Sequence, residues 1–285
     1  MKKFIRNNLP FDNNMKKNWD SDGFLIIENF YTNHECDELI FEAEKLISDF
    51  DPNLIRSIFD TRKQEHVDDR YFLESADKIR FFFEDKAFDE KGNLLKEKKY
   101  SINKIGHALH DLNDKFHKFS HREDLDQIAK SIGIINPLLV QSMYIFKQPN
   151  IGGEVVCHQD STFLYTEPES AVGFWVALED ATIKNGCLWV ASGCHKGSLR
   201  KLFTKKNNKM IMLPLNDEPF EKTDTPLEVR KGSLVLLHGR LPHYSCENTS
   251  AKSRHAYTFH VIDASSKYPK ENWLQRESLP LKGFL

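Results

Sequence analysis

The stretch EVVCHQD (154–160) decides how the rest of this chain is interpreted. It follows the turn signal PNIGG (149–153), and its two valines are typical of a β-strand. Because side chains alternate along a strand, His158 and Asp160 are predicted to project from one face. Gln159 and Cys157 would point to the other face, where we expect the thiol to be buried and inert. The imidazole and the carboxylate together provide two candidate ligands for a metal ion.

A second stretch supplies candidates for a third ligand. SLVLL (233–237) is typical of a buried strand, and His238 and His243 flank the Gly/Pro turn that follows it. From spacing alone, either histidine can be the distal ligand. Two histidines and one carboxylate form the facial triad of non-haem iron(II) sites, which leaves adjacent coordination positions open.

The other histidines are interpreted as surface or boundary residues. HVD (66–68) and HRE (121–123) have similar spacing but lie in charged or polar stretches without a strand pattern. Four histidines between positions 107 and 121 include pairs spaced as in zinc sites, at positions 107, 110, 117 and 121. No HExxH pattern or third ligand accompanies them, so we do not expect a second metal site there.

Arg254 opens the strand-like stretch RHAYTFHVI (254–262), where it shares one face with Ala256 and Thr258. A guanidinium inside a β-barrel costs free energy unless it meets an anion, and its fork of donors suits a carboxylate. A small dicarboxylate accounts for both features of the sequence. One end would chelate the metal, and the other end would be held by Arg254.

Composition excludes several classes of protein. The net charge of −2 gives no general attraction to nucleic acid or to a membrane. The five cysteines are odd in number and form no CxxC pair, which argues against a disulfide framework and a structural zinc site. No apolar run approaches the ~18 residues of a membrane span, and the N-terminus has no apolar signal core. We expect an intracellular, cytoplasmic protein; the sequence does not determine its oligomeric state, and a monomer is compatible with it.

The chain is expected to form a single domain over residues 1–285. Its helix-rich part covers about 1–136, with a polar, loosely held start at 1–20, a capped helix from Thr32 to about Phe50 and a second helix from Ser101. A β-helix core is expected over about 137–265, because short strand-like stretches alternate with turn residues there. The polar segment 200–226 can be a lid over a pocket or a surface loop.

The sequence resembles the phytanoyl-CoA dioxygenase family of iron(II)- and 2-oxoglutarate-dependent oxygenases along nearly its whole length. The stretches that carry the resemblance are DGFLIIENF (22–30), DKIRFFFE (77–84), SINKIGHALH (101–110), VQSMYIFKQP (140–149), HQDSTFLYTEP (158–168), EDATIKNGCLW (179–189), SRHAYTFH (253–260) and ENWLQ (271–275). The resemblance implies a mainly β protein, a double-stranded β-helix (jelly roll, cupin-like) with a helical buttress.

The resemblance also implies roles for individual residues. It selects His243 over His238 and makes His158, Asp160 and His243 the iron ligands. It implies contacts with the co-substrate from five residues, which are Lys104, Met143, Trp175, Ser245 and Arg254.

The implied activity uses O2 to decarboxylate 2-oxoglutarate to succinate while a small-molecule substrate is hydroxylated. Related halogenases have a small residue at the carboxylate position, so Asp160 favours hydroxylation. One alternative is a low-turnover sensor or scaffold that binds iron and 2-oxoglutarate. A zinc or manganese hydrolase or isomerase of the cupin type is a weaker alternative, because it gives Arg254 and Ser245 no role. The sequence does not select a substrate, and phytanoyl-CoA is not implied by it.

Overall fold

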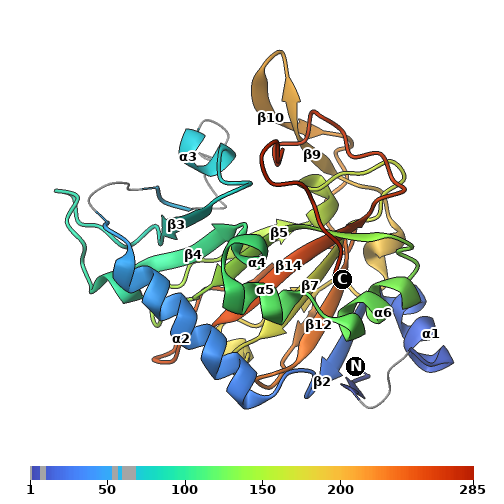
Figure 1. The fold of residues 1–285 in the computed structure, drawn as a ribbon, viewed down its shortest axis with the longest axis horizontal. Helices are drawn as coiled ribbons and strands as arrows, with labels where there is room; N and C mark the ends of the chain where they lie inside the picture. The colour runs from blue at the N-terminus through green and yellow to red at the C-terminus, as the bar shows by residue number, and fades with distance from the viewer. Residues whose placement is uncertain (1, 7–10, 53–56, 60–68) are drawn as a thin grey trace.

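Two β-sheets form the body of the protein in a computed structural model that describes residues 2–6, 11–52, 57–59 and 69–285 (Figure 1). The larger sheet has eight strands. In spatial order they are β1 (Phe4–Ile5), β2 (Phe24–Glu28), β12 (Leu234–His238), β7 (Val172–Ala177), β14 (Ala256–Asp263), β5 (Pro137–Ile145), β4 (Ile102–His107) and β3 (Ile79–Phe83). Apart from the parallel β1–β2 pair, neighbouring strands in this sheet are antiparallel.

The smaller sheet has four antiparallel strands and forms the other wall of a central cavity. Its strands, in order, are β11 (Thr225–Leu227), β8 (Leu188–Val190), β13 (His243–Ser245) and β6 (Val155–His158). Side chains of both sheets line the same cavity, for example Trp175 and Thr258 from the larger sheet and Ser245 from the smaller one. Two facing antiparallel sheets around a central pocket are the jelly roll that the sequence predicts.

Helices cover one face of the larger sheet, in front of its strands in Figure 1. The helices of this layer are α1 (Asn13–Asp22), α2 (Asn33–Asp49), α4 (Leu109–Leu112), α5 (Asp114–Ser120) and α6 (Glu123–Ser131), whereas the short α3 (Arg70–Leu73) lies apart from them, above β3 in Figure 1. The predicted capping box begins α2, with Thr32 and Glu35 satisfying each other's backbone amides. Leu39 of α2 and Phe116 of α5 share one hydrophobic cluster with Phe174 of β7, so these helices support the sheet. Among the helices described, none combines the length and apolar character of a membrane span.

The prediction of a loosely held start is wrong for much of residues 1–20. Asp12 caps α1 by accepting hydrogen bonds from two backbone amides, and Gly23 ends the helix in the left-handed conformation. Met15 and Trp19, one helical turn apart, are buried in the main hydrophobic cluster. Two apolar residues in a polar stretch are a weak periodic signal, which explains why the helix was not expected.

The predicted helix from Ser101 is a strand followed by short helices. β4 covers Ile102–His107 and pairs with β3 and β5, and helical structure begins only at Leu109. The apolar residues at spacings of four and three that indicate one helix begin with Ile105, which lies in the strand. The N-terminal part of the chain therefore contributes strands to the larger sheet as well as helices that support it.

The segment 200–226 contains an antiparallel hairpin rather than an unstructured loop. Its strands are β9 (Lys201–Lys206) and β10 (Lys209–Pro214), and the pair projects from the top of the molecule in Figure 1. Phe203 of β9 is buried in a hydrophobic cluster with Trp273, which anchors the hairpin. Met212 and Phe220 from this segment line the central cavity.

Candidate metal centre

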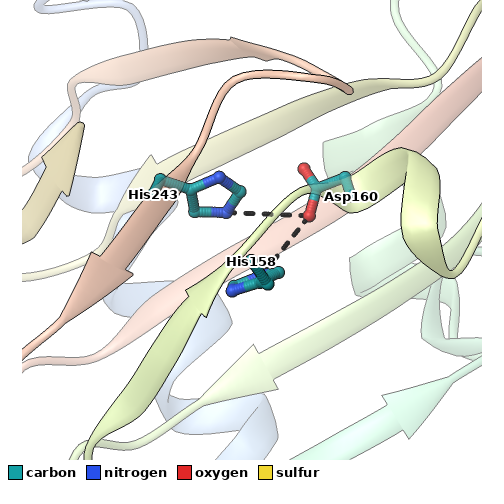
Figure 2. Close-up of side chains that lie close together, drawn as sticks. All are labelled: His158, Asp160 and His243. Atoms are coloured by element: carbon teal, nitrogen blue, oxygen red, sulfur yellow. Dashed lines mark ion pairs between the residues drawn. The ribbon is translucent and has the colours of Figure 1, made fainter. Parts of the chain in front are cut away.

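Two histidines from adjacent strands of the smaller sheet meet one carboxylate in the wall of the cavity (Figure 2). His158 at the end of β6 is the register partner of His243 at the start of β13, so strand pairing brings these distant residues together. Asp160 begins the 3-10 turn η4 (Asp160–Thr162) directly after β6. Its Oδ1 lies 3.6 Å from Nε2 of His158 and 3.6 Å from Nε2 of His243.

Backbone carbonyls orient both imidazoles. Nδ1 of His158 lies 2.8 Å from the carbonyl of Val156, and Nδ1 of His243 lies 2.9 Å from the carbonyl of Leu241. A carbonyl oxygen only accepts, so each Nδ1 carries the proton and each Nε2 lone pair is directed toward Asp160. Burial and the neighbouring His158 lower the pKa of His243 to about 4, which keeps that ring neutral. Neutral imidazoles with free Nε2 atoms are the form that binds metal ions.

The second oxygen of Asp160 lies beside a third imidazole but has no hydrogen-bond partner of good geometry among the described residues. Oδ2 lies 3.2 Å from Nε2 of His260 on β14, and Nε2 of Gln141 on β5 lies 3.3 Å from Nδ1 of the same ring. Gly173 of β7 leaves room for this pair, since an added Cβ would lie 2.9 Å from Oδ2. Burial by itself would raise the pKa of the Asp160 carboxyl, but His260, His243 and His158 hold it well below its usual range.

Arg254 lies in the same cavity as the triad and is almost fully buried, with 1% of its surface exposed. Its Nε and Nη1 atoms are buried without a hydrogen-bond partner among the described residues. Its guanidinium carbon lies 5.4 Å from the centre of the Trp175 ring. Burial lowers the pKa of Arg254 to about 10, which is still well above neutral pH, and no ion pair joins this buried cation to a carboxylate among the described residues. A buried cation of this kind fits an anion that the cavity receives.

The other residues that were assigned to the co-substrate by resemblance also line this cavity. They are Lys104, Met143, Trp175 and Ser245. Gln141, Met143 and Ile145 alternate along β5 and all line the cavity, as residues on one face of a strand do. Lys104 lies on β4 rather than on a helix, and its Nζ lies 3.9 Å from the sulfur of Met143.

Several predictions about other residues need correction. His107 and His110 are buried rather than at the surface, and His107 lines the cavity. Cys157 is only partly buried and lines the cavity, although burial raises the pKa of its thiol to about 11 and keeps it protonated. His238 lies outside the cluster of possible ligands and contacts the rings of Trp19 and His195. The HVD stretch at 66–68 lies outside the described residues.

Two buried residues of the cavity were not expected from the sequence. His260 continues the alternation of Arg254, Ala256 and Thr258 by one step, so a longer strand pattern could have found it. Lys147 follows β5, and a lysine after a strand gives no signal of burial. Its side chain nevertheless reaches the hydroxyl of Ser245.

The residues present fit a divalent iron and a small dicarboxylate. Two imidazoles and one carboxylate on one side of an ion suit iron(II), and the unpaired donors of Arg254 suit a carboxylate. Oxygenases that use iron(II), 2-oxoglutarate and O2 are the class of protein that this fold and this set of side chains define. The family model described as Phytanoyl-CoA dioxygenase (PhyH) matches residues 19–256, so the chain belongs to that family.

Curated relatives support this family over nearly their whole length. An Arabidopsis thaliana protein named Phytanoyl-CoA dioxygenase is 46% identical over 261 residues, which cover 91% of this chain and 92% of the relative. The Bos taurus Phytanoyl-CoA dioxygenase domain-containing protein 1 is 44% identical over 268 residues, which cover 90% of this chain and 92% of the relative.

Solved structures with the same fold are more distant in sequence. The non-heme alpha-ketoglutarate-dependent carbocyclase SnoK from nogalamycin biosynthesis matches with a TM-score of 0.62 at 16% identity, covering 91% of this chain and 87% of its own. EctD from S. alaskensis in its apo form matches with a TM-score of 0.60 at 18% identity, covering 96% and 85%. At these identities the matches establish the jelly-roll fold.

Proposed function

We propose that the protein is an iron(II)- and 2-oxoglutarate-dependent dioxygenase that forms succinate and CO2 from 2-oxoglutarate and hydroxylates a small molecule. The observation that carries this proposal is the buried guanidinium of Arg254, which has unpaired donors in the cavity that also holds the triad. Names of relatives at 46% and 44% identity, which contain the word dioxygenase, support the same reaction class.

In this proposal His158, Asp160 and His243 hold the metal from one side and leave its other positions to the co-substrate and to O2. Arg254 and the hydroxyl of Ser245 bind the far carboxylate of 2-oxoglutarate. Trp175 and Met143 form walls of the co-substrate space, and the ammonium of Lys104 adds a positive charge to it. Bound iron(II) and 2-oxoglutarate would supply the activation of O2 and the oxidising power for hydroxylation.

The substrate space lies in a cavity of about 230 Å³. Aromatic and aliphatic side chains form much of its wall beside the triad, including Phe59, Phe72, Phe163, Met212, Phe220 and Trp273. These side chains exclude water from the metal centre, which protects a reactive oxidant from side reactions. They favour a substrate whose reacting carbon lies in an apolar part of a small molecule.

The test is to incubate the purified protein with iron(II), O2 and labelled 2-oxoglutarate and to measure succinate and CO2. Wild-type protein should form both, and Arg254→Leu should weaken 2-oxoglutarate binding by roughly 100-fold because it removes a buried charged partner. The Arg254→Leu variant should keep its affinity for the metal, whereas equal loss of both affinities would indicate misfolding. An iron-loaded wild-type protein that neither binds 2-oxoglutarate nor forms succinate would contradict the proposal. Tight binding without turnover, even with candidate substrates, would favour a sensor instead.

A further inference from the structure

Lys147 is a second buried cation at the end of the cavity where Arg254 lies. Only 2% of its surface is exposed, and it lines the same cavity. Its backbone carbonyl accepts hydrogen bonds from the amide of Arg254 at 3.3 Å and from the side chain of Asn248 at 2.8 Å. The positions of Lys147 and Arg254 are therefore coupled through the main chain.

The ammonium of Lys147 has three acceptors, none of which is a carboxylate. Nζ lies 2.8 Å from the carbonyl of Gly153, 3.3 Å from the carbonyl of Ser245 and 2.8 Å from Oγ of Ser245. Three acceptors match the three N–H donors of an ammonium group. Because Oγ of Ser245 accepts from Lys147, the hydrogen of that hydroxyl remains available to another acceptor.

The surrounding structure makes room for this lysine but does not neutralise it. Gly186 passes so close that an added Cβ would lie 2.6 Å from Cε of Lys147. The nearby acid Glu84 accepts hydrogen bonds through Oε2 from Asn103 and from the amide of Gly153, and its Oε1 is buried without a hydrogen-bond partner among the described residues. No ion pair of Lys147 or Arg254 is present among the described residues. Two adjacent buried basic side chains that form no ion pair are costly, which is consistent with a site that receives an anion.

We propose that Lys147 is a positioning residue that holds the Ser245 hydroxyl as a donor toward the far carboxylate of 2-oxoglutarate. This inference rests on the proposed function and adds a residue to its co-substrate site. Lys147 acts through Ser245, since its own three donors are already used. Burial and the neighbouring Arg254 lower the pKa of Lys147 to about 7, and a bound carboxylate would favour the charged form.

The test measures binding of 2-oxoglutarate to manganese(II)-loaded protein by calorimetry, for wild type, Lys147→Met, Ser245→Ala and the double variant. Lys147→Met should raise the Kd for 2-oxoglutarate roughly 10- to 100-fold in the wild-type background, the range for hydrogen bonds to charged groups. In the Ser245→Ala background the same substitution should change the Kd less than about threefold. Lys147→Gln keeps a donor without the charge and should fall between Lys147→Met and wild type.

A truncated probe separates this role from a structural one. 2-Oxopentanoate has the chain length of 2-oxoglutarate but a methyl group in place of the far carboxylate. Its Kd and the Kd for manganese(II) should be the same in Lys147→Met and in wild type, whereas a distorted site would weaken both. An unchanged Kd for 2-oxoglutarate in Lys147→Met, or an equal loss in the Ser245→Ala background, would overturn the inference alone. A wild-type protein that does not bind 2-oxoglutarate would overturn the proposed function as well.

Discussion

The two oxygens of the Asp160 carboxylate have different neighbours, and this difference gives the candidate metal centre its orientation. Oδ1 lies 3.6 Å from both ligand imidazoles, whereas Oδ2 lies 3.2 Å from Nε2 of His260. An imidazole beside Oδ2 limits the rotation of the carboxylate, so Oδ1 stays directed at the metal position. His260 is thus expected to support metal binding without being one of the three ligands.

Replacing His260 by Leu should lower the affinity for iron(II) or manganese(II) by roughly 10- to 100-fold, the usual effect of losing a partner of a metal ligand. The reason is that the buried Oδ2 of Asp160 would lose the imidazole beside it, and the carboxylate would be held less firmly. Calorimetric titration of the metal into the apo protein measures the change. His107→Gln is the matched control, because His107 is a buried cavity imidazole that bonds to Ser75 rather than to Asp160. Equal affinities of wild type and His260→Leu would exclude this role.

The sequence carried different amounts of information about individual site residues. The alternation of side chains placed His158 and Asp160 on one side, and the structure brings them together with His243. Spacing could not choose between His238 and His243, because which of the two faces His158 depends on the register of β13 with β6. Lys147 could not be predicted, since its burial depends on the approach of Gly153 and Ser245 from other parts of the chain.

Among the strands, β4 shows how tertiary pairing overrides a helical pattern. Ile105, Leu109 and Leu112 have helical spacing, but the chain is extended up to His107 because β3 and β5 pair with both edges of β4. The helical residues begin after Ala108, so one periodic pattern crossed two elements. Strands in the β core were easier to predict, because turn residues separate them.

The strand geometry leaves Lys104 buried over the ring of Phe59, with 6% of its surface exposed. Burial lowers the pKa of Lys104 well below its ordinary value. At any pH below the pKa that this lysine has in the unfolded chain, the unfolded state therefore binds the proton more strongly than the folded state does. The lysine therefore reduces stability at neutral pH. Lys104→Met should raise the free energy of unfolding of the apo protein by about 1–2 kcal/mol, measured by urea denaturation at pH 7.

The same Lys104→Met variant should bind 2-oxoglutarate more weakly than wild type, if the lysine faces the co-substrate as proposed. A gain in stability with a loss in affinity distinguishes a functional charge from a structural one. Lys99→Met is the control, since Lys99 is exposed and its replacement should change stability by less than about 0.5 kcal/mol. A Lys104→Met protein that is less stable than wild type would contradict this account of the strand.

The molecule as a whole should lose stability in mild acid because it buries neutral histidines. His238 is the clearest case, since its Nδ1 accepts a hydrogen bond from the amide of Arg240 and burial lowers its pKa to about 4. The folded state then binds fewer protons than the unfolded state between the unfolded pKa of about 6.5 and pH 4. Stability is fully present above that window and is lost as the pH falls through it.

For His238 alone the expected loss between pH 7 and pH 5 is about 2 kcal/mol. His238→Gln keeps a hydrogen-bond acceptor but cannot titrate. Between pH 7 and pH 5, the free energy of unfolding of this variant should therefore fall by about 2 kcal/mol less than that of the wild type. Urea denaturation at both pH values measures the difference. His34→Gln serves as the control because the His34 side chain is exposed, and its replacement should change the free energy of unfolding at pH 7 by less than about 0.5 kcal/mol. An equal loss of unfolding free energy in wild type and in His238→Gln would show that the His238 ring is not held in its neutral form by burial.

We also propose that residues 1–285 fold as a single domain, because the helix-rich part and the β core share one interior. β1 and β2 from the start of the chain extend the larger sheet beside β12, and Leu39, Tyr144 and Phe284 belong to one hydrophobic cluster.

A ligand that binds only the folded site should then stabilise the entire chain. At 100 times the Kd, the gain is about 2.7 kcal/mol, which corresponds to a rise in Tm of ~5 °C for a chain of this size. Scanning calorimetry with manganese(II) and 2-oxoglutarate should show one transition that moves as a unit, and no shift in Asp160→Ala. Two transitions, of which only one responds to the ligands, would mean that the helix-rich part and the β core unfold separately.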